Sequence, residues 1–384
     1  MRNIDDLPML LNDIFNEECR VIHFILDHRV GGPHVYVQTL SKALGYTVNS
    51  TLVTAGRGPV TDVALLNLRR WFRPLYALEV LLNAFVISVR FGLFHRPSLF
   101  HVHGAANIAP LLAALFCRMP VVWHFHETVT GQRTLARIGG WLVRHTRHRV
   151  VTVAVAARAV FGQPNAHLAP GAVDITFWDS KLVEPFLANR AITGVSPLRL
   201  LAVANLNPLK GLDTLIDALP ISGLPIELNI IGAELDTHAN YTSVIKRRAV
   251  EIASNHPEIS IHFLGKQPAT SIRTHLAVCD VFILPSRSEA CPLALIEAMA
   301  MARPVIATDV GAVREVLPFA QHAFICPPNH PQKLATAIAE MGKLSSKDRT
   351  RLAQENRAAV ELNFTPAHLA RNLLKCYQLL LNGK

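Results

Sequence analysis

Residues 281–316 read "VFILPSRSEACPLALIEAMAMARPVIATDVGAVREV". A short apolar strand leads into a loop, a helix follows, and a second strand begins near residue 304. Proline suits the first turn of a helix, so Pro292 predicts a helix from about residue 292 to 301. Two acids stand eight residues apart, Glu289 in the loop and Glu297 on the helix. The stretch therefore predicts a strand–loop–helix unit that carries two carboxylates beyond the strand.

The same alternation of strand and helix runs along the whole chain. Short β-branched, apolar runs such as 20–26 and 121–127 in the first half, and 198–206 and 226–232 in the second, are separated by longer helical patterns. Near-continuous apolar strands imply parallel sheets that are covered on both faces. The sequence predicts an α/β fold with two doubly wound, Rossmann-like domains, in which ligands sit at the carboxyl ends of the strands.

Turn residues gather near 184–197 and suggest where the domains divide. We assign residues 1–190 to an N-terminal acceptor-binding domain and 198–365 to a C-terminal donor-binding domain. The last helix, about 366–384, has an apolar side that must dock on a surface, and the first domain is the candidate.

Composition narrows the class of protein. The 384 residues are 50% hydrophobic and 17% charged, so large buried cores are expected and disorder is not. The start "MRNIDDLPML" is acidic where a secretory signal would be basic, and the six cysteines are scattered without a CxxC pair. These features are typical of a cytoplasmic protein with reduced thiols.

Glu297 lies on an apolar helix face, with Leu293, Ile296 and Ala300 at helical spacing. An ionised carboxylate there is costly unless a partner donates hydrogen bonds to it, as a pair of sugar hydroxyls would. The free amides of Leu293 and Ala294 at the helix start suit an anion such as a diphosphate. The plain alternative is a partly exposed glutamate at the edge of the apolar stripe.

The segment 284–316 resembles the signature of the retaining nucleotide-sugar glycosyltransferases of family 4: two glutamates at this spacing, then "EAMA", "PVIA" and a glycine turn that ends in Glu. The resemblance implies a GT-B fold, in which the two parallel sheets face each other across a cleft. It also implies that Glu297 holds the ribose hydroxyls and that Glu289 is catalytic and binds the donor sugar. Metal-independent chemistry without a cofactor, apart from the nucleotide sugar itself, is implied too.

"VANLNPLKGLDTLIDAL" (203–219) matches the family where a lysine clamps the diphosphate. Lys210 takes that place, although a solvated loop lysine would look the same in isolation. The family's usual arginine is replaced by Asn205, which removes one positive charge from the leaving group. Arg287 or Arg314 would have to supply that charge.

The first half offers weaker matches. Gly31 and Gly32 follow the first strand, where paired glycines let amides approach a phosphate or sugar, though such pairs most often mark turns. By resemblance His126 is catalytic and contacts the donor sugar, and Glu127 orients it. His103 is a further candidate for contact with sugar or acceptor.

The pairs "HVH" (101–103) and "HFH" (124–126) each place two histidines on one face of a strand. Two such pairs offer enough imidazoles for zinc. No carboxylate or cysteine completes a recognisable site, so we predict no metal.

Basic residues dominate the first half. No acid occurs between Glu127 and Asp174, whereas six arginines do, and "RRWFRPLY" (69–76) precedes an almost wholly apolar helix. Arginines among aromatics suit an anionic membrane surface and also nucleic acid, but no nucleic-acid motif appears. A basic domain surface over a buried helix is the plain alternative.

The sequence as a whole predicts a retaining glycosyltransferase that moves a hexosyl unit from a nucleoside-diphosphate sugar to a glycan or lipid-linked acceptor. Synthesis of cell-surface polysaccharide or glycolipid, in the cytoplasm or at the inner membrane face, is the expected setting. The alternative is a catalytically degenerate GT-B protein that binds without transfer. A dinucleotide oxidoreductase is disfavoured because no GxGxxG follows any strand.

Overall fold

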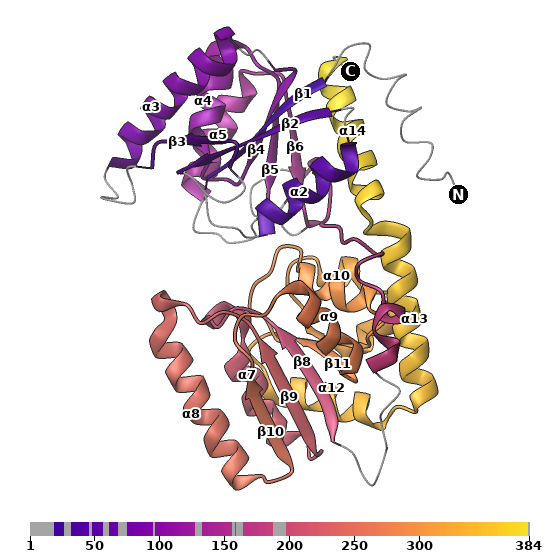
Figure 1. The fold of residues 1–384 in the computed structure, drawn as a ribbon. Coiled ribbons are helices and arrows are strands. Elements are labelled where there is room, and N and C mark those ends of the chain that lie inside the picture. The colour runs from indigo at the N-terminus through magenta and orange to yellow at the C-terminus, as the bar shows by residue number, and fades with distance from the viewer. Residues whose placement is uncertain are drawn as a thin grey trace. The chain divides into compact units, whose positions relative to one another are not determined.

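The computed structural model describes residues 19–26, 32–45, 48–56, 61–67, 75–94, 97–126, 133–155, 158, 164–186 and 197–382. The chain forms two compact units, Met1–Ala172 with Pro366–Lys384, and Val173–Thr365 (Figure 1). Each unit contains one parallel sheet with helices packed against it, so the predicted α/β class with two doubly wound sheets is confirmed.

The first unit is built on a seven-stranded sheet in the order β3-β2-β1-β4-β5-β6-β7. The order changes direction between β1 and β4, which makes that point the topological switch point of the sheet. Its strands are β1 (Cys19–Ile25), β2 (Val48–Ala55), β3 (Val63–Leu65), β4 (Leu99–His103), β5 (Val121–Phe125), β6 (His148–Thr152) and β7 (His167–Leu168).

The two faces of this sheet differ because successive side chains of a strand point to opposite sides. One face is apolar, with Phe24, Phe100 and Trp123 in a core shared with α3, α4 and α5. The other face carries histidines toward α2 and α14. The helical segments are α2 (Gly32–Leu44), α3 (Tyr76–Ile87), the π-helical η5 (Ser88–Phe94), α4 (Ile108–Cys117), α5 (Arg133–Arg144) and α14 (Pro366–Leu381).

The last helix, α14, belongs to the first unit although it is last in the chain. The Tyr377 hydroxyl lies 2.7 Å from Nδ1 of His101, and Arg147 donates hydrogen bonds to the carbonyls of Leu380 and Leu381. Its apolar side is buried as its spacing predicts, through Leu369, Leu373, Cys376 and Leu380.

The second unit is built on a six-stranded sheet in the order β10-β9-β8-β11-β12-β13. Its switch point lies between β8 and β11, which are neighbours in space although two strands separate them in sequence. The strands are β8 (Leu198–Val203), β9 (Ile226–Ile231), β10 (Ile259–Phe263), β11 (Val281–Leu284), β12 (Val305–Thr308) and β13 (Ile325–Cys326).

Helices cover this second sheet, and the core between α7, α8, α12 and the strands is largely aliphatic, as Ile216, Leu228 and Ile338 illustrate. The α-helices are α7 (Leu212–Ile221), α8 (Ala239–Asn255), α9 (Ala269–Val278), α10 (Leu293–Ala300), α11 (Val313–Val316), α12 (Pro331–Lys343) and α13 (Ser346–Asn363). Short 3-10 turns are η7 (Ser180–Phe186), η8 (Pro208–Lys210), η9 (Asp236–His238) and η10 (Phe319–Phe324).

Candidate functional site

Helix α10 begins where its proline predicts. Pro292 is the N-cap and gives no side-chain cap, and its carbonyl accepts hydrogen bonds from the amides of Leu295 and Ile296. The amides of Leu293 and Ala294 precede the first intrahelical bond, so the helix itself does not use them. This end of α10 therefore presents free donors and the positive end of the helix dipole, as an anion site requires.

Glu289 sits in the loop between β11 and α10 and is held from two sides. Oε1 of its carboxylate accepts hydrogen bonds from Nζ of Lys210 and from Oγ of Ser286, both at 2.7 Å. The carboxylate side chain is 11% exposed and the lysine side chain 27%. Lys210 follows β8 and Glu289 follows β11, so the pair forms at the switch point of the sheet.

Two contacts explain why these loops meet. Gly211 has a φ of +62°, and a Cβ there would lie 2.1 Å from the carbonyl oxygen of Pro285, so the close approach needs glycine. The amide of Arg287 also donates a 2.7 Å hydrogen bond to the carbonyl of Leu209. The Lys-Gly pair thereby fixes Lys210 against the loop that carries Glu289.

A second glycine fixes the other side of that loop. Gly311 has a φ of +54°, and a Cβ there would lie 2.1 Å from the carbonyl oxygen of Glu289. The next residue, Ala312, donates a 2.8 Å hydrogen bond to the carbonyl of Ala290. The glycine turn after β12 is therefore the support on which the backbone of Glu289 rests.

Glu297 is half-buried on α10, beside the fully buried Ile296. Its carboxyl has no hydrogen-bond partner among the described residues, and burial raises its pKa from the ordinary 4.5 to about 7. A carboxyl held out of water without donors is a poor contribution to stability and a good receptor for hydroxyl groups. This is the property that the apolar neighbours in the sequence predict.

The side-chain oxygen of Asn205 is engaged within the second unit. Asn205 follows β8, and its Oδ1 accepts a 3.1 Å hydrogen bond from the amide of Ala233 after β9. A Cβ on Gly232 would lie 1.9 Å from the carbonyl oxygen of Ala204, so these two strand ends approach very closely. The asparagine thus joins two loops where the family carries a cation.

The two arginines that the sequence offers as substitutes for that cation are both paired. Arg287 makes a bidentate salt bridge to Asp213, at 2.8 and 2.5 Å. Burial alone would raise the pKa of Asp213, but hydrogen bonds from Arg287 and Tyr241 lower it. Arg314 is bound to Asp309 at 2.8 Å. Lys210 is a cation in direct contact with Glu289, and Arg287 braces the loop around it.

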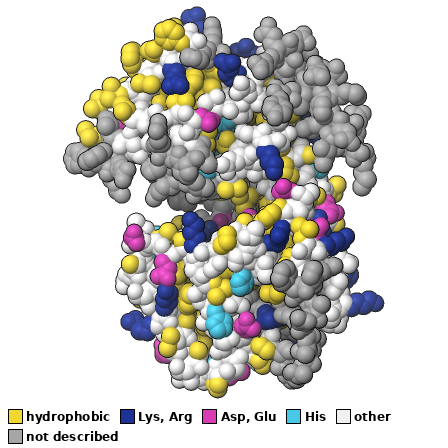
Figure 2. Space-filling view, in the orientation of Figure 1, with side chains coloured by type: hydrophobic (Ala, Val, Ile, Leu, Met, Phe, Trp, Pro, Cys, Tyr) yellow, Lys and Arg dark blue, Asp and Glu magenta, His cyan; other side chains and the backbone are white. Residues whose placement is uncertain are grey.

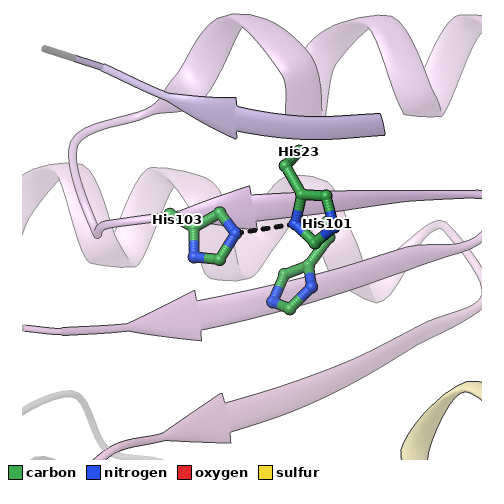
Figure 3. A group of neighbouring side chains, drawn as sticks. All are labelled: His23, His101 and His103. Atoms are coloured by element: carbon green, nitrogen blue, oxygen red, sulfur yellow. Dashed lines mark hydrogen bonds between the residues drawn. The ribbon is translucent and has the colours of Figure 1, made fainter. Parts of the chain in front are cut away.

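In the first unit, five histidines come together on one face of strands β1, β4 and β5 and just beyond β5. They form two hydrogen-bonded series. His23 Nδ1 lies 3.1 Å from His103 Nε2, and His103 Nδ1 lies 2.8 Å from His126 Nε2. His101 Nε2 lies 3.1 Å from His124 Nδ1, and the series continues to the Tyr377 hydroxyl. Figure 3 shows how His23, His101 and His103 lie together on adjacent strands.

Burial makes these rings neutral. His23, His101, His103 and His124 are at most 2% exposed. Desolvation lowers the pKa of His23 and of His126 to about 3. For His101, His103 and His124 burial, aided by the neighbouring imidazoles, lowers the pKa well below its usual value. His126, half-buried at the end of the series, is the member nearest to solvent.

Two sets of three rings have the spacing of a metal site: His23 with His101 and His103, and His103 with His124 and His126, with ligand atoms within 4.8 Å of one another. Neutral imidazole is the metal-binding form of histidine. Three histidines can bind zinc, but a metal in either set would have to replace a ring-to-ring hydrogen bond. In this structure the rings form a hydrogen-bonded network.

The remaining predicted residues of the first unit are only partly described. Gly32 opens α2 and is exposed, and a Cβ on it would meet no atom of the described residues within 4 Å. Gly31 and Glu127 lie outside the described residues. The sequence alone singles out neither His23 nor Ser286. The partner of His23, His103, is 80 residues away in the sequence. Ser286 is only three residues from Glu289, but serine is too common in loops to stand out.

Known protein families match both units. A family model for "Glycosyltransferase Family 4" matches residues 30–176, and one for "Glycosyl transferases group 1" matches residues 190–359. The chain belongs to this family of glycosyltransferases, with the GT-B fold that the sequence predicted.

Individual relatives are distant. The chain is 30% identical over 183 residues to the amylovoran biosynthesis glycosyltransferase AmsK of Erwinia amylovora, a match that covers 45% of this chain and 42% of AmsK. The chain thus spans less than half the length of that curated relative. Among solved structures, a glycosyltransferase from Rickettsia africae has a TM-score of 0.78 at 17% identity, with 96% of this chain and 100% of that one covered. Anabaena HepE in complex with UDP and glucose has a TM-score of 0.75 at 17% identity, with 93% and 99% covered.

Proposed function

We propose that the chain is a retaining glycosyltransferase that moves a hexosyl unit from a nucleoside-diphosphate sugar to a glycan or lipid-linked acceptor. The observation that carries this proposal is the Lys210–Glu289 pair beside α10, whose Glu297 carboxyl has no partner among the described residues, at the switch point of the second sheet. Family membership and the polysaccharide role in the name of AmsK support synthesis of a cell-surface polysaccharide or glycolipid.

Each residue has a role that its surroundings suit. The Lys210 ammonium has three donors, of which Glu289 uses one, so the others can bind the diphosphate oxygens as charge develops on the leaving group. The free amides at the start of α10 add donors to the same phosphates. Glu297 would accept hydrogen bonds from the ribose hydroxyls, which would also stabilise its ionised form.

Glu289 would contact the transferred sugar while Lys210 and Ser286 hold its carboxylate in place. In the first unit, His126 would contact the donor sugar, with Glu127 and His103 as further contacts to sugar or acceptor. Catalysis is then mostly positioning together with stabilisation of the departing diphosphate.

One observation favours a second candidate function, a GT-B protein that binds a nucleotide sugar without transferring it. The neutral Asn205 bonds to Ala233, and Arg287 is taken up by Asp213, so the leaving group receives one cation fewer than in the family pattern. Binding without turnover would be the result.

A panel of UDP-, GDP- and ADP-sugars distinguishes these candidates. Thermal shift reports binding, and release of free nucleotide reports slow hydrolysis in the absence of acceptor. A donor that both stabilises the protein and is hydrolysed supports the transferase. Stabilisation without nucleotide release, even with oligosaccharide and lipid-linked acceptors added, supports the binding protein. No response to any donor contradicts both.

A further inference from the structure

The first unit carries an apolar surface that no described part of the protein covers. Helix α3 and the π-helical η5 that continues it form one rod of 19 residues, Tyr76–Phe94, long and apolar enough to cross a membrane by length and composition. Only 28% of its most apolar window is buried. Figure 2 shows hydrophobic side chains gathered on this side of the molecule, over the position of α3 in Figure 1.

The rod has two distinct sides. Its inner side packs into the core through Ala84, Ile87 and Phe91, and holds two buried polar residues, Glu79 and Asn83. The Asn83 amide bonds to both the amide and the carbonyl of Leu66, each at 3.0 Å. These contacts fasten the rod to the protein, so it does not leave the sheet to span a bilayer.

The outer side is apolar and open to solvent. Its exposed positions repeat about every four residues, which keeps them in one stripe along the rod. Phe85 is 68% exposed, Leu81 60% and Phe94 75%. The other large members of the stripe are Leu78, Leu82, Val86 and Leu93. At the α-helical rise of 1.5 Å per residue, the stripe from Leu78 to Phe94 runs for at most about 25 Å along the surface.

The neighbouring helices extend this surface. A Cβ on Gly92 would lie 2.3 Å from Sγ of Cys117, so the end of α4 approaches η5 very closely and brings the 72% exposed Phe116 beside it. Helix α5, which packs against α4, presents Trp141 at 54% exposure. We name this the α3–α5 face: the exposed apolar side chains of α3, η5, α4 and α5.

The charge around the α3–α5 face has one sign. Arginines are exposed along it, and the sole acid among the described residues 75–94, 97–126 and 133–155 is Glu79, which is 1% exposed and points inward. Exposed arginines along the face are Arg90, Arg118, Arg137 and Arg144. Arg147 is exposed too, but it bonds to the end of α14. An apolar stripe with aromatic and arginine neighbours, and without exposed acids in those ranges, matches the interface of an anionic bilayer.

We propose that the α3–α5 face docks on the surface of a membrane that contains anionic lipid, with the rod lying in the interface rather than spanning it. The exposed apolar side chains would enter the boundary between headgroups and acyl chains, and the arginines would contact lipid phosphates. A second copy of the chain fits less well, because a symmetric contact would bring the same exposed arginines together. This inference does not rest on the donor chemistry of the second unit.

Flotation of the full chain with vesicles tests the proposal. Vesicles of phosphatidylcholine alone are compared with vesicles that also contain phosphatidylglycerol, at low and high ionic strength. We expect the protein to float with the anionic vesicles, to remain behind with phosphatidylcholine alone, and to be released by salt.

Two variants and two matched controls give the test its specificity. Leu81→Gln with Phe85→Gln should lower partitioning at least about tenfold, since two large side chains no longer gain from burial. The control, Val250→Gln with Leu362→Gln, changes residues of similar exposure, 67% and 65%, in the second unit and should leave partitioning unchanged. Arg137→Glu with Arg144→Glu should lower partitioning more than about tenfold. Its control, Lys347→Glu with Arg351→Glu on α13, carries the same charge change and should leave partitioning unchanged.

Each variant should fold, because the substituted side chains are exposed and do not pack in the core. Circular dichroism and thermal unfolding check this. Failure of the folded wild type to bind anionic vesicles would overturn the proposal. So would equal binding by the Leu81→Gln, Phe85→Gln variant and its control. Light scattering, which measures the oligomeric state, can also contradict the proposal. If the wild type is a dimer, and Leu81→Gln with Phe85→Gln dissociates the dimer without changing vesicle binding, the α3–α5 face is a protein interface.

Discussion

In the second unit, the loops after β8 and β11 bring a lysine, a serine and Glu289 into contact beside α10, which carries Glu297. In the first unit, strands β1, β4 and β5 bring together histidines that hydrogen bond to one another. Both groups lie near the switch point of a doubly wound parallel sheet. The second unit's group is charged and has one carboxyl without a partner among the described residues. The first unit's group is neutral and its rings are hydrogen-bonded mainly to one another.

This difference shows that one architecture serves two purposes. The charged group has capacity left for a ligand, because Lys210 keeps two donors and Glu297 has no partner in the described part of the chain. Six nitrogens of the histidine group contact other rings, but Nε2 of His23 and Nε2 of His124 are buried without a hydrogen-bond partner among the described residues. His126 is the member nearest to solvent. We therefore propose that the diphosphate and ribose bind to the second unit.

The largest effect should follow from Glu289→Gln. The substitution keeps the shape of the side chain but removes its charge, so both Lys210 and the transferred sugar lose an ionic partner. We expect turnover of the donor to fall about 100-fold or more, with the protein still folded. Glu234→Gln is the control, because Glu234 pairs with Lys246 on the surface. Normal turnover by the Glu289 variant would remove that residue from the site.

The histidine group should make the first unit sensitive to acid. Unfolded histidines titrate at their ordinary pKa of 6.5, whereas burial lowers the pKa of His23 and His126 to about 3 when folded. Between these values the unfolded state binds more protons, so stability falls as pH drops below about 6.5. Each such histidine can remove up to about 1.4 kcal/mol of stability per pH unit.

Hydrogen exchange at pH 7 and pH 5, read by mass spectrometry after correction for intrinsic exchange rates, checks this expectation. Strands β1, β4 and β5 should lose protection at the lower pH well before β8, β9 and β11 do. Equal loss in the two units would contradict the neutral, buried state of the histidines.

Lys210→Met should weaken binding of the donor by about 10- to 100-fold, as expected for loss of a charge-assisted contact to phosphate. Titration calorimetry with the free nucleoside diphosphate measures it. The nucleoside alone is the control ligand. It should bind more weakly, and equally to the wild type and to Lys210→Met, because it has no phosphate for the lysine to contact. A uniform loss for both ligands would mean that the substitution disturbs the loop as a whole rather than removing a charge from the phosphate site.

The smallest effect concerns Glu297→Gln. A pKa raised to about 7 means that the folded state holds its proton more tightly than the unfolded state, so stability is lost as pH rises from 4.5 to 7. At pH 8 the variant should therefore unfold at a temperature a few degrees higher than the wild type. The corresponding difference in the free energy of unfolding is about 1–3 kcal/mol. At pH 4 the difference should vanish. Donor affinity should fall in the same variant, and unchanged affinity would exclude the ribose contact.

Local features of the site could be read from the sequence. Pro292 set the start of α10, and the spacing of apolar residues placed Glu297 on a costly face. The pairs "HVH" and "HFH" predicted histidines on a common side of their strands because strand side chains alternate. The fold class followed from apolar strands that alternate with helices.

Contacts between distant segments could not be read in the same way. The pairing of Arg287 with Asp213 joins residues 74 positions apart, and that of His101 with Tyr377 joins residues 276 apart. Nothing local distinguishes an arginine available to a phosphate from one engaged by an aspartate. For the same reason the sequence suggested Arg287 as a substitute cation, whereas the structure shows it paired with Asp213 in the first turn of α7.

Hydrogen exchange with and without the donor found in the nucleotide-sugar panel locates the ligand without depending on turnover, and so tests the proposed donor site before any variant is made. We predict the strongest protection in segments 205–211 and 285–297, at the lysine loop, the Glu289 loop and the start of α10. A donor that binds yet leaves both segments unchanged would contradict the assignment of the donor site to the second unit.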